Sequence, residues 1–338
     1  MSELLRIVLV GAGMIPIPPP GYGAVEKHIW NLAQALEARG HEVSIVNDVF
    51  GPESKDEYRF AFWARKQVAK VPHDVLHLHT PGVATIFGAI GPRRWVYTTH
   101  SRHWAGAQGL GERIGFALER RAVEAAAEAI AVSRFVAQQI ECPTHVVPNG
   151  VDVERYAPLP AARTGRVVVG LGEVAEHKQW HVAAEAVADL DAQLRIIGPI
   201  RDVAYAKRVE TLGQGKTLLL GALDEPDLVR ELGGADVMAH PSVSESFGMA
   251  VVEGMSCGLP VVTSDLLSFL VKHGQEGYLI PTQGEARVTK LREHLQLLLQ
   301  DVALRARMGA MARETAARDY SWASVAERVE RVYRKVVA

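Results

Sequence analysis

The chain has 338 residues, of which 48% are hydrophobic and 22% charged, and this is the composition of a globular protein with about two domains of ~150 residues each. A disordered polymer and a single small module are both excluded. The 37 Lys and Arg residues nearly balance the 39 Asp and Glu residues, so no global positive field draws the protein to nucleic acid or to anionic lipid.

Cysteine usage and hydropathy indicate the compartment. Two cysteines, Cys142 and Cys257, lie far apart in the sequence, which favours a reducing, cytoplasmic setting over a disulfide framework or a structural zinc site. The apolar stretch from Ile7 to Val10 is too short for the core of a signal peptide, and no apolar run approaches the ~20 residues that span a bilayer. We therefore expect a soluble protein, or one that touches a membrane only at its surface.

Short β-branched runs alternate with segments of helical period in the first half of the chain, which is the pattern of parallel-sheet α/β units. Strands are predicted at Arg6–Val10, Glu42–Val46, Val75–Leu78, Trp95–Thr99, Ala129–Val132 and His145–Val147. The segments between them include helices predicted at Ala24–Ala38, Gly111–Ala127 and Ser133–Gln139.

A second α/β series follows a linker that is predicted between Val153 and Gly165, where two prolines prevent either element from continuing. Its strands are predicted at Val167–Leu171, Gln193–Ile197, Thr217–Leu220, Val237–His240, Pro260–Thr263 and Gly277–Ile280. Because open α/β sheets bind ligands at the carboxyl ends of their strands, we expect the functional residues there. The last helix, Trp322–Val337, carries valines on one face that are predicted to pack, namely Val325, Val329, Val332 and Val336.

The strongest local signal is the segment Pro241–Val262, which leads from a strand through a helix into the next strand. Glu245 precedes this helix and Glu253 lies inside it, and a carboxylate can accept hydrogen bonds from two neighbouring sugar hydroxyls. The first N–H groups of the helix are expected to be unpaired and to suit a phosphate or sugar oxygen. These N–H groups belong to Gly248, Met249, Ala250 and Val251.

Two glutamates eight positions apart in this context resemble the retaining glycosyltransferases of family 4, which have the GT-B fold. Further segments resemble the same family in the same order, namely Pro18–Glu26, Leu36–Val43, Thr98–His100, Pro148–Asp152 and Tyr320–Trp322. The resemblance implies an α/β protein with two Rossmann-like domains that face a central cleft. It implies an acceptor domain over 1–155, a nucleotide-sugar donor domain over 156–320, and a helix over 321–338 that crosses back to the first domain.

The resemblance also implies a reaction and its residues. A hexose-type sugar would move from a nucleotide diphosphate donor to a hydroxyl of a carbohydrate, lipid or small-molecule acceptor, by a front-face mechanism that needs no metal or cofactor. His100, Lys178 and Glu245 would be the catalytic residues. The donor would be bound by Gly23, Lys178, Glu245, Phe247, Gly248, Met249, Ala250 and Glu253.

Other motifs point elsewhere only weakly. Gly11-Ala12-Gly13 follows a strand, but Pro16 occupies the third glycine position of a dinucleotide fingerprint. Strand alternation places His77 and His79 on one face, which could suit a metal, yet no third ligand is evident, so these two and His103 are interpreted as structural. Asp189-Leu190-Asp191 is interpreted as a solvated helix terminus, and we therefore predict no catalytic metal.

Two departures from the family pattern keep other functions open. Glu173 stands where the family usually has arginine, and Asp265–Ser268 replaces a usual pair of glycines. Either Glu173 points away from the diphosphate or a base offsets it, and Arg201 is the residue expected to do so. The alternatives are a nucleotide-sugar epimerase or hydrolase on the same fold, or a catalytically weak sugar-nucleotide binding protein.

A basic segment between positions 93 and 121 suggests a further partner. Its arginines are Arg93, Arg94, Arg102, Arg113, Arg120 and Arg121. Such a run is usually a solvated face. The alternative is a patch that meets anionic lipid headgroups or a phosphorylated acceptor, with the protein at the inner face of the membrane.

Overall fold

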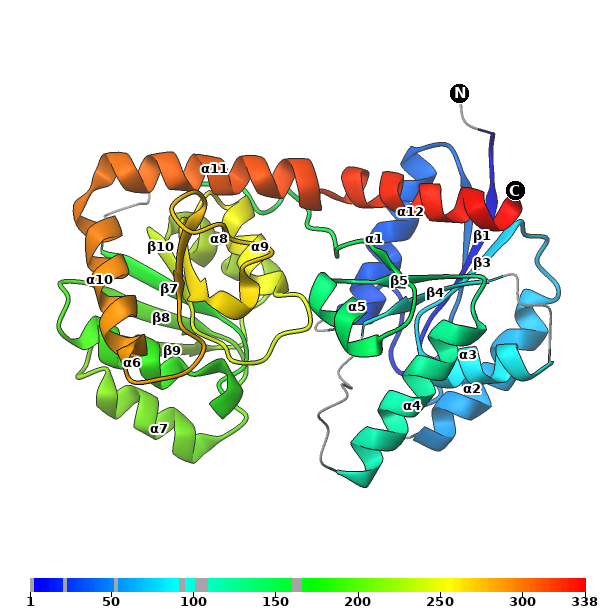
Figure 1. The fold of residues 1–338 in the computed structure, drawn as a ribbon, viewed down its shortest axis with the longest axis horizontal. Helices are drawn as coiled ribbons and strands as arrows, with labels where there is room; N and C mark the ends of the chain where they lie inside the picture. The colour runs from blue at the N-terminus through cyan, green and yellow to red at the C-terminus, as the bar shows by residue number, and fades with distance from the viewer. Residues whose placement is uncertain (1–2, 21–22, 52–53, 91–94, 101–108, 160–165) are drawn as a thin grey trace. The chain divides into compact units, whose positions relative to one another are not determined.

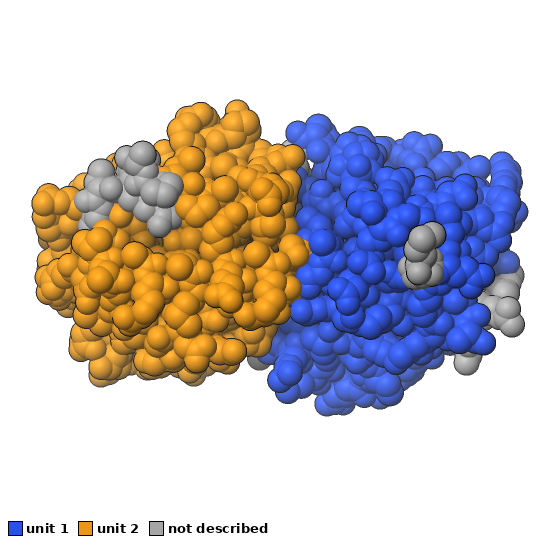
Figure 2. Space-filling view, turned by 90° about the horizontal axis from the view of Figure 1, so that it is seen from above, with its two compact units in different colours: residues 1–150, 322–338 blue, residues 151–321 orange. Residues whose placement is uncertain are grey.

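The computed structural model describes residues 3–20, 23–51, 54–90, 95–100, 109–159 and 166–338. The chain divides into two compact units, which Figure 2 distinguishes by colour. Unit 1 consists of residues 1–150 and 322–338, and unit 2 of residues 151–321. No helix among the described residues is long and apolar enough to cross a membrane.

Unit 1 is built on a parallel sheet that has six strands in the described residues, in the order β2-β1-β3-β4-β5-β6 (Figure 1). The strands are β1 Arg6–Val10, β2 Glu42–Val46, β3 Val75–Leu78, β4 Trp95–Thr99, β5 Glu128–Ala131 and β6 His145–Val146. The helices are α1 Ala24–Ala38, α2 Ser54–Val68, α3 Pro81–Ile90, α4 Leu110–Ala125, α5 Arg134–Ile140 and α12 Trp322–Val337.

The local sequence explains these elements. Every residue of β3 and β4 is buried, as expected for parallel strands that helices cover on both faces. The α5 helix begins where the Ser133 hydroxyl accepts a hydrogen bond from the Val136 N–H, which is an N-cap. The α4 helix ends two residues before its predicted end because Ala126 adopts an extended conformation that leads into β5.

The predicted packing face of α12 is confirmed. Val325, Val329 and Val332 are buried in the core of unit 1, where they lie with apolar residues of α1. Arg39, at the end of α1, donates to the Glu330 carboxylate at 2.7 Å. The last helix of the chain is therefore attached to unit 1 by an apolar face and by an ion pair.

Unit 2 contains a second parallel sheet, again with six strands in the described residues, in the order β12-β11-β10-β7-β8-β9 (Figure 1). Its strands are β7 Val167–Leu171, β8 Gln193–Ile197, β9 Thr217–Gly221, β10 Val237–His240, β11 Val261–Ser264 and β12 Gly277–Ile280. Its helices are α6 Trp180–Ala188, α7 Val203–Leu212, α8 Glu225–Gly234, α9 Met249–Ser256, α10 Ala286–Gln300 and α11 Val302–Tyr320. The α/β class that the sequence predicts is confirmed in both units.

Two details fix where the strands of unit 2 begin. β11 begins at Val261, one residue after the predicted start, because Pro260 has no N–H to donate to a neighbouring strand. The fully buried Asp236 accepts hydrogen bonds from the N–H groups of Arg166 and Val167, each at 3.0 Å. This carboxylate ties the start of β7 to the start of β10.

Candidate functional site

The middle of the second sheet has the geometry of a ligand site. β7 and β10 pair side by side, but the chain continues from β7 to β8 on one side and from β10 to β11 on the other. Ligands of open α/β sheets bind at the carboxyl ends of the strands at such a switch in strand order. The loop after β7 carries Lys178, and the loop after β10 carries Glu245.

Lys178 and Glu245, which are far apart in the sequence, meet directly. The Lys178 ammonium donates to Oε1 of Glu245 at 2.5 Å, and both side chains are largely buried. The His240 ring nitrogen Nε2 lies 2.7 Å from the same carboxylate oxygen, and His240 has no exposed surface. Among the described residues, both of these hydrogen bonds fall on Oε1.

The electrostatics of this cluster fix the protonation of Glu245. Burial by itself would raise the pKa of the Glu245 carboxyl, but the hydrogen bonds and charges of His240 and Lys178 outweigh burial and hold the pKa at about 2. A carboxylate can only accept hydrogen bonds, so His240 must donate from Nε2. Glu245 is therefore an ionised carboxylate held in one orientation by two donors.

Packing holds the two loops together. Trp180 is fully buried and donates from its indole N–H to the carbonyl of Glu173, which anchors the loop that carries Lys178. The buried Arg287 donates to the Gln179 side chain at 2.6 Å and to the Pro241 carbonyl at 2.7 Å. These contacts bridge the loops after β7 and β10.

Sequence reasoning missed His240 and Arg287. His240 gave one signal that could have identified it, because it ends a buried strand immediately before the predicted ligand loop. Nothing local marks Arg287, which lies in the first turn of α10 and reaches both loops only in the folded unit.

The α9 helix begins as predicted for a phosphate site, with one correction. Gly248 is its N-cap and has φ 96°, a left-handed conformation that glycine adopts without strain. The N–H of Val251 donates to the Gly248 carbonyl at 3.0 Å, so the expectation that this N–H is unpaired is wrong. Donor binding by the N–H groups of Gly248, Met249 and Ala250 stays a prediction.

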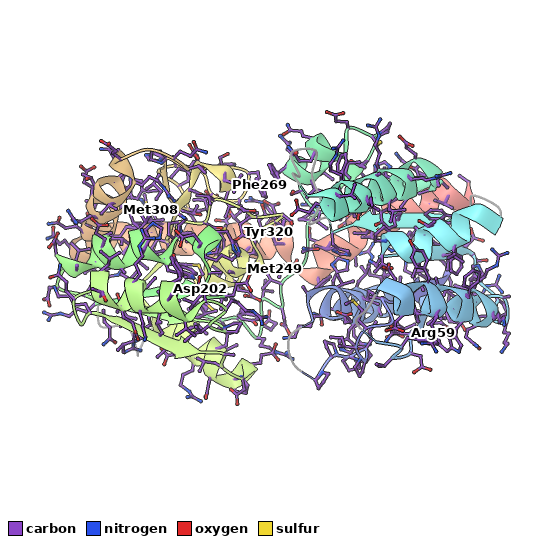
Figure 3. All side chains as sticks on the ribbon, turned by 90° about the horizontal axis from the view of Figure 1, so that it is seen from below. Arg59, Asp202, Met249, Phe269, Met308 and Tyr320 are labelled. Carbon is purple, nitrogen blue, oxygen red and sulfur yellow. The ribbon has the colours of Figure 1, made fainter. Side chains whose placement is uncertain are left out.

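The other two donor residues predicted in unit 2 have different surroundings. Phe247 is 4% exposed, and its ring packs against Phe269 and Tyr320, at centroid distances of 6.4 and 5.9 Å. Figure 3 labels Phe269, Tyr320 and Met249 in the same part of unit 2. The Phe247 side chain therefore belongs to the core of unit 2. Glu253 lies in α9 and is half-buried.

Arg201 offsets the charge of Glu173, as one of the two sequence-based expectations proposed. Its Nε donates to the Glu173 carboxylate at 3.2 Å, and His177 lies 3.5 Å from the other carboxylate oxygen.

The acidic pair after α6 is confirmed as a solvated helix terminus, since Asp189 is 61% and Asp191 82% exposed. Each of the two forms an ion pair with an arginine at 3.0 Å.

Gly23 and His100, the two site residues predicted in the first half of the chain, lie in unit 1. Gly23 is the N-cap of α1, and a Cβ there would lie 2.5 Å from the Ile15 side chain and 3.1 Å from that of Pro19. His100 directly follows β4 and is half-buried. Burial, together with His28 and His77, lowers the pKa of His100 well below 6.5, so the imidazole is neutral at pH 7. Their roles in transfer stay predictions.

The interpretation of His77 as structural is confirmed. The same interpretation of His79 leaves out two histidines that lie close to it. The two nitrogens of His77 lie 2.7 Å from the Tyr333 hydroxyl and 2.7 Å from the Thr98 hydroxyl. His79 lies on the same face but is close to two other histidines, His28 and His100. The expectation that His79 has no third possible metal ligand nearby is therefore wrong. His103 lies outside the described residues.

Three of the six arginines of the predicted basic patch lie among the described residues. Arg113, Arg120 and Arg121 lie on α4 and are exposed, and Arg120 pairs with Glu124 at 3.0 Å. The remaining arginines of the patch lie outside the described residues, namely Arg93, Arg94 and Arg102.

Two family models match successive parts of the chain. The model described as Glycosyltransferase Family 4 matches residues 23–155, and the model described as Glycosyl transferases group 1 matches residues 156–315. The chain belongs to the family 4 glycosyltransferases. The predicted family and the predicted enzyme class are thereby confirmed.

Curated relatives of this glycosyltransferase carry transferase and synthase names. It is 29% identical to the phosphatidyl-myo-inositol mannosyltransferase of Mycobacterium leprae, with 93% of each chain covered. It is also 29% identical to the alpha-maltose-1-phosphate synthase of Mycobacterium tuberculosis, with 72% of this chain and 73% of the relative covered.

Solved structures confirm the GT-B fold of this glycosyltransferase. Sucrose-phosphate synthase from Thermosynechococcus elongatus matches with a TM-score of 0.81 and 20% identity, and 98% of each chain is covered. HepE from Anabaena, in complex with UDP and glucose, matches with a TM-score of 0.74 and 19% identity over 97% of this chain and 98% of HepE. At these identities the likeness concerns the fold alone.

Proposed function

We propose that this glycosyltransferase moves a hexose from a nucleotide diphosphate donor to an acceptor hydroxyl with retention of the anomeric configuration. The observation that carries this proposal is the ionised Glu245 carboxylate, held between Lys178 and His240 where the strand order of the second sheet switches. Its second oxygen can accept from hydroxyls of the donor sugar, and a fixed acceptor favours one sugar orientation.

The donor diphosphate would be stabilised by protein groups alone. The Lys178 ammonium supplies a positive charge, and the first N–H groups of α9 supply the positive end of a helix dipole. Glu253, within the same helix, would accept from the ribose hydroxyls. The ion pair between Arg201 and Glu173 favours full activity over a catalytically weak binding protein, because it offsets the carboxylate that replaces the usual arginine.

Retention follows from a front-face reaction. The bond between the anomeric carbon and the leaving phosphate oxygen breaks while the acceptor oxygen bonds to the same face. The acceptor proton passes to the departing phosphate oxygen, so no protein nucleophile is required. The neutral imidazole of His100 would contact the sugar and phosphate region and would add no charge there.

A donor screen followed by a transfer assay tests this function. A thermal-shift panel of UDP-, GDP- and ADP-sugars should identify one donor that raises the melting temperature, because a ligand that binds the native state stabilises it. HepE was solved with UDP and glucose, and the Mycobacterium leprae relative is named a mannosyltransferase, so UDP-glucose and GDP-mannose come first.

The product distinguishes the proposal from its alternatives. With donor and acceptor, proton NMR should find the new glycosidic bond in the anomeric configuration of the donor. Donor consumption without acceptor would indicate a hydrolase or an epimerase, and an inverted product would refute the front-face mechanism. The Glu245→Gln variant should bind the nucleotide alone but lose at least about 100-fold in turnover.

The exposed face of α4 suggests where a lipid acceptor would approach, at the cytoplasmic surface of a membrane. Leu110 is 76% and Ile114 52% exposed, and Arg113 and Arg121 lie near them on the same helix. Apolar side chains beside arginines favour anionic membrane surfaces. The name of the Mycobacterium leprae relative includes a phospholipid, which supports a lipid acceptor.

Vesicle binding tests the membrane contact separately from catalysis. The protein should co-sediment with vesicles that contain phosphatidylglycerol and much less with pure phosphatidylcholine. The double variant Leu110→Ser with Ile114→Ser should lose this binding. The matched change Leu218→Ser, at a 41% exposed position of unit 2, should retain it. Equal binding by both variants would refute the role of α4.

A further inference from the structure

Three histidines from three different elements converge in unit 1. His28 comes from α1, His79 directly follows β3, and His100 directly follows β4. Each histidine offers one nitrogen as a metal ligand, and these three nitrogens lie within 4.8 Å of one another. His79 and His100 follow the neighbouring strands β3 and β4, and the strand order of the first sheet switches beside them, between β1 and β3.

All three imidazoles are in the form that binds metals. Burial lowers the pKa of His28 to about 4, and burial with neighbouring histidines lowers the pKa values of His79 and His100 well below 6.5. Neutral imidazoles have a nitrogen lone pair, and the neutral ring is the commonest metal ligand in proteins.

Two nitrogens of the cluster lack partners. Nδ1 of His28 and Nε2 of His79 are buried and have no hydrogen-bond partner among the described residues. The residues themselves are 7% and 2% exposed. Buried polar atoms are nearly always satisfied in native proteins, by protein, water or an ion. His77 is excluded from such a site, because Tyr333 and Thr98 occupy both of its nitrogens.

One pair of nitrogens in the cluster is spaced as in a zinc site. Two imidazole nitrogens bound to one tetrahedral zinc at about 2.0–2.1 Å lie about 3.4 Å apart. Nδ1 of His79 and Nε2 of His100 lie 3.2 Å apart and share a hydrogen bond, which an ion bound between them would replace. An imidazole binds one ion through one nitrogen, so His79 would bind either through this Nδ1 or through its unpartnered Nε2. The His28 ring lies edge-on to the His100 ring at a centroid distance of 4.9 Å.

Donor chemistry selects the ion. The three candidate donors are imidazoles without a carboxylate, which favours borderline ions such as Zn²⁺, Ni²⁺, Cu²⁺ and Co²⁺. Mg²⁺ and Ca²⁺ prefer oxygen ligands and would not be held. Three protein ligands leave the fourth tetrahedral position to water.

We infer that His28, His79 and His100 form a three-histidine site for a borderline transition-metal ion, with zinc the first to test, and that an occupied site inhibits glycosyl transfer. Binding of the ion stands on the three histidines alone. Inhibition rests on the proposed function, because a His100 imidazole bound to zinc is not free to contact the sugar and phosphate region.

Metal binding is measured first, on the untagged full chain after removal of metals. Calorimetry in a competing chelator should find one tight Zn²⁺ site and no Mg²⁺ site. Co²⁺ should give the strong visible absorption of tetrahedral coordination. X-ray absorption of the wild-type zinc form should find three imidazole ligands, and fewer than three would overturn the inference without any variant.

Variants assign the site. His28→Phe keeps a ring at that position and should weaken Zn²⁺ binding on the order of 100-fold. His79→Asn should do the same, and circular dichroism checks that both variants fold. The control His294→Phe alters a histidine of unit 2 whose ring stacks on Tyr278 at 4.3 Å, and it should leave the affinity unchanged. Unchanged affinity in both folded site variants would overturn the assignment.

Transfer assays with and without Zn²⁺ test inhibition separately from metal binding. Stoichiometric Zn²⁺ should inhibit transfer by the wild-type enzyme, and a chelator should restore it. If zinc binds at the three histidines and transfer continues unchanged, the inhibitory half is wrong and the metal site stands. If the protein transfers no sugar at all, the proposed function fails, and the calorimetric result still decides whether the metal site exists.

Discussion

Replacing Lys178 with methionine should separate the charge of this side chain from its packing. Methionine has a similar length and apolar stem, but it brings no charge to the donor diphosphate and no hydrogen bond to Glu245. Removing one preorganised electrostatic contact to a transition state costs about 100-fold or more in turnover, which corresponds to about 2.7 kcal/mol. We therefore expect kcat/KM for transfer to fall by at least about 100-fold.

The same change should destabilise unit 2, because it removes one of the two hydrogen-bond donors to Glu245 and leaves His240. The difference between the usual pKa of 4.5 for this carboxyl and its pKa of about 2 in the folded protein corresponds to about 3 kcal/mol, supplied by both partners against the opposing effect of burial. Loss of one partner should therefore cost about 2 kcal/mol and lower the melting temperature by about 4–8 °C.

Steady-state kinetics, donor titration and thermal melts measure these effects. The control is Lys207→Met, which removes an exposed lysine from α7 in the same unit and should leave all three measurements unchanged. A double-mutant cycle with Glu245→Gln should find strongly non-additive losses, because the two side chains touch. A Lys178→Met enzyme with wild-type turnover, or additive losses in the cycle, would refute this account of the site.

Three further predictions concern metal, donor affinity and acid stability. Transfer should survive exhaustive chelation, and loss of activity with EDTA that magnesium or manganese restores would contradict the proposed role of Lys178 and α9. Because Arg201 already pairs with Glu173, Arg201→Gln should weaken binding of the nucleotide diphosphate in isothermal titration. Glu173→Arg should tighten this binding and make it more sensitive to salt. The opposite order of affinities would mean that Glu173 holds a donor hydroxyl. The pKa of Glu330 is lowered from 4.5 to about 2, because hydrogen bonds from Arg39 and Arg334 outweigh burial, so its contribution is complete above pH 4.5 and lost as the pH falls toward 2. Urea melts should therefore find Glu330→Gln less stable than wild type at pH 7, with a difference that shrinks in acid, and a constant difference would refute this ion pair as the cause.

Local patterns in the sequence determined the fold class. Buried β-branched runs such as Val75–Leu78 and Trp95–Thr99 mark the strands, because a parallel strand covered on both faces must be apolar along its whole length. Val325, Val329 and Val332 of α12 likewise fall on one helical face and are buried. These patterns depend only on neighbours in the chain, so they could be recognised without the tertiary structure.

The sequence also determined which loops carry the candidate site, since Lys178 and Glu245 both follow predicted strands. It did not determine the use of Phe247, because an apolar side chain suits a ligand pocket and a core equally well. Packing against Phe269 and Tyr320 places the side chain in the core of unit 2, and donor binding by Phe247 stays a prediction.

Only the tertiary structure decided which side chains meet. Contact of Lys178 and His240 with one oxygen of Glu245 depends on β7 lying beside β10, and the approach of His28 to His79 and His100 depends on the order β1-β3-β4. Strand order is set by the packing of crossover helices over long stretches of chain, and no local periodicity encodes it. For this reason the ionised carboxylate held by two donors and the three-histidine cluster are properties of the folded units rather than of any motif in the sequence.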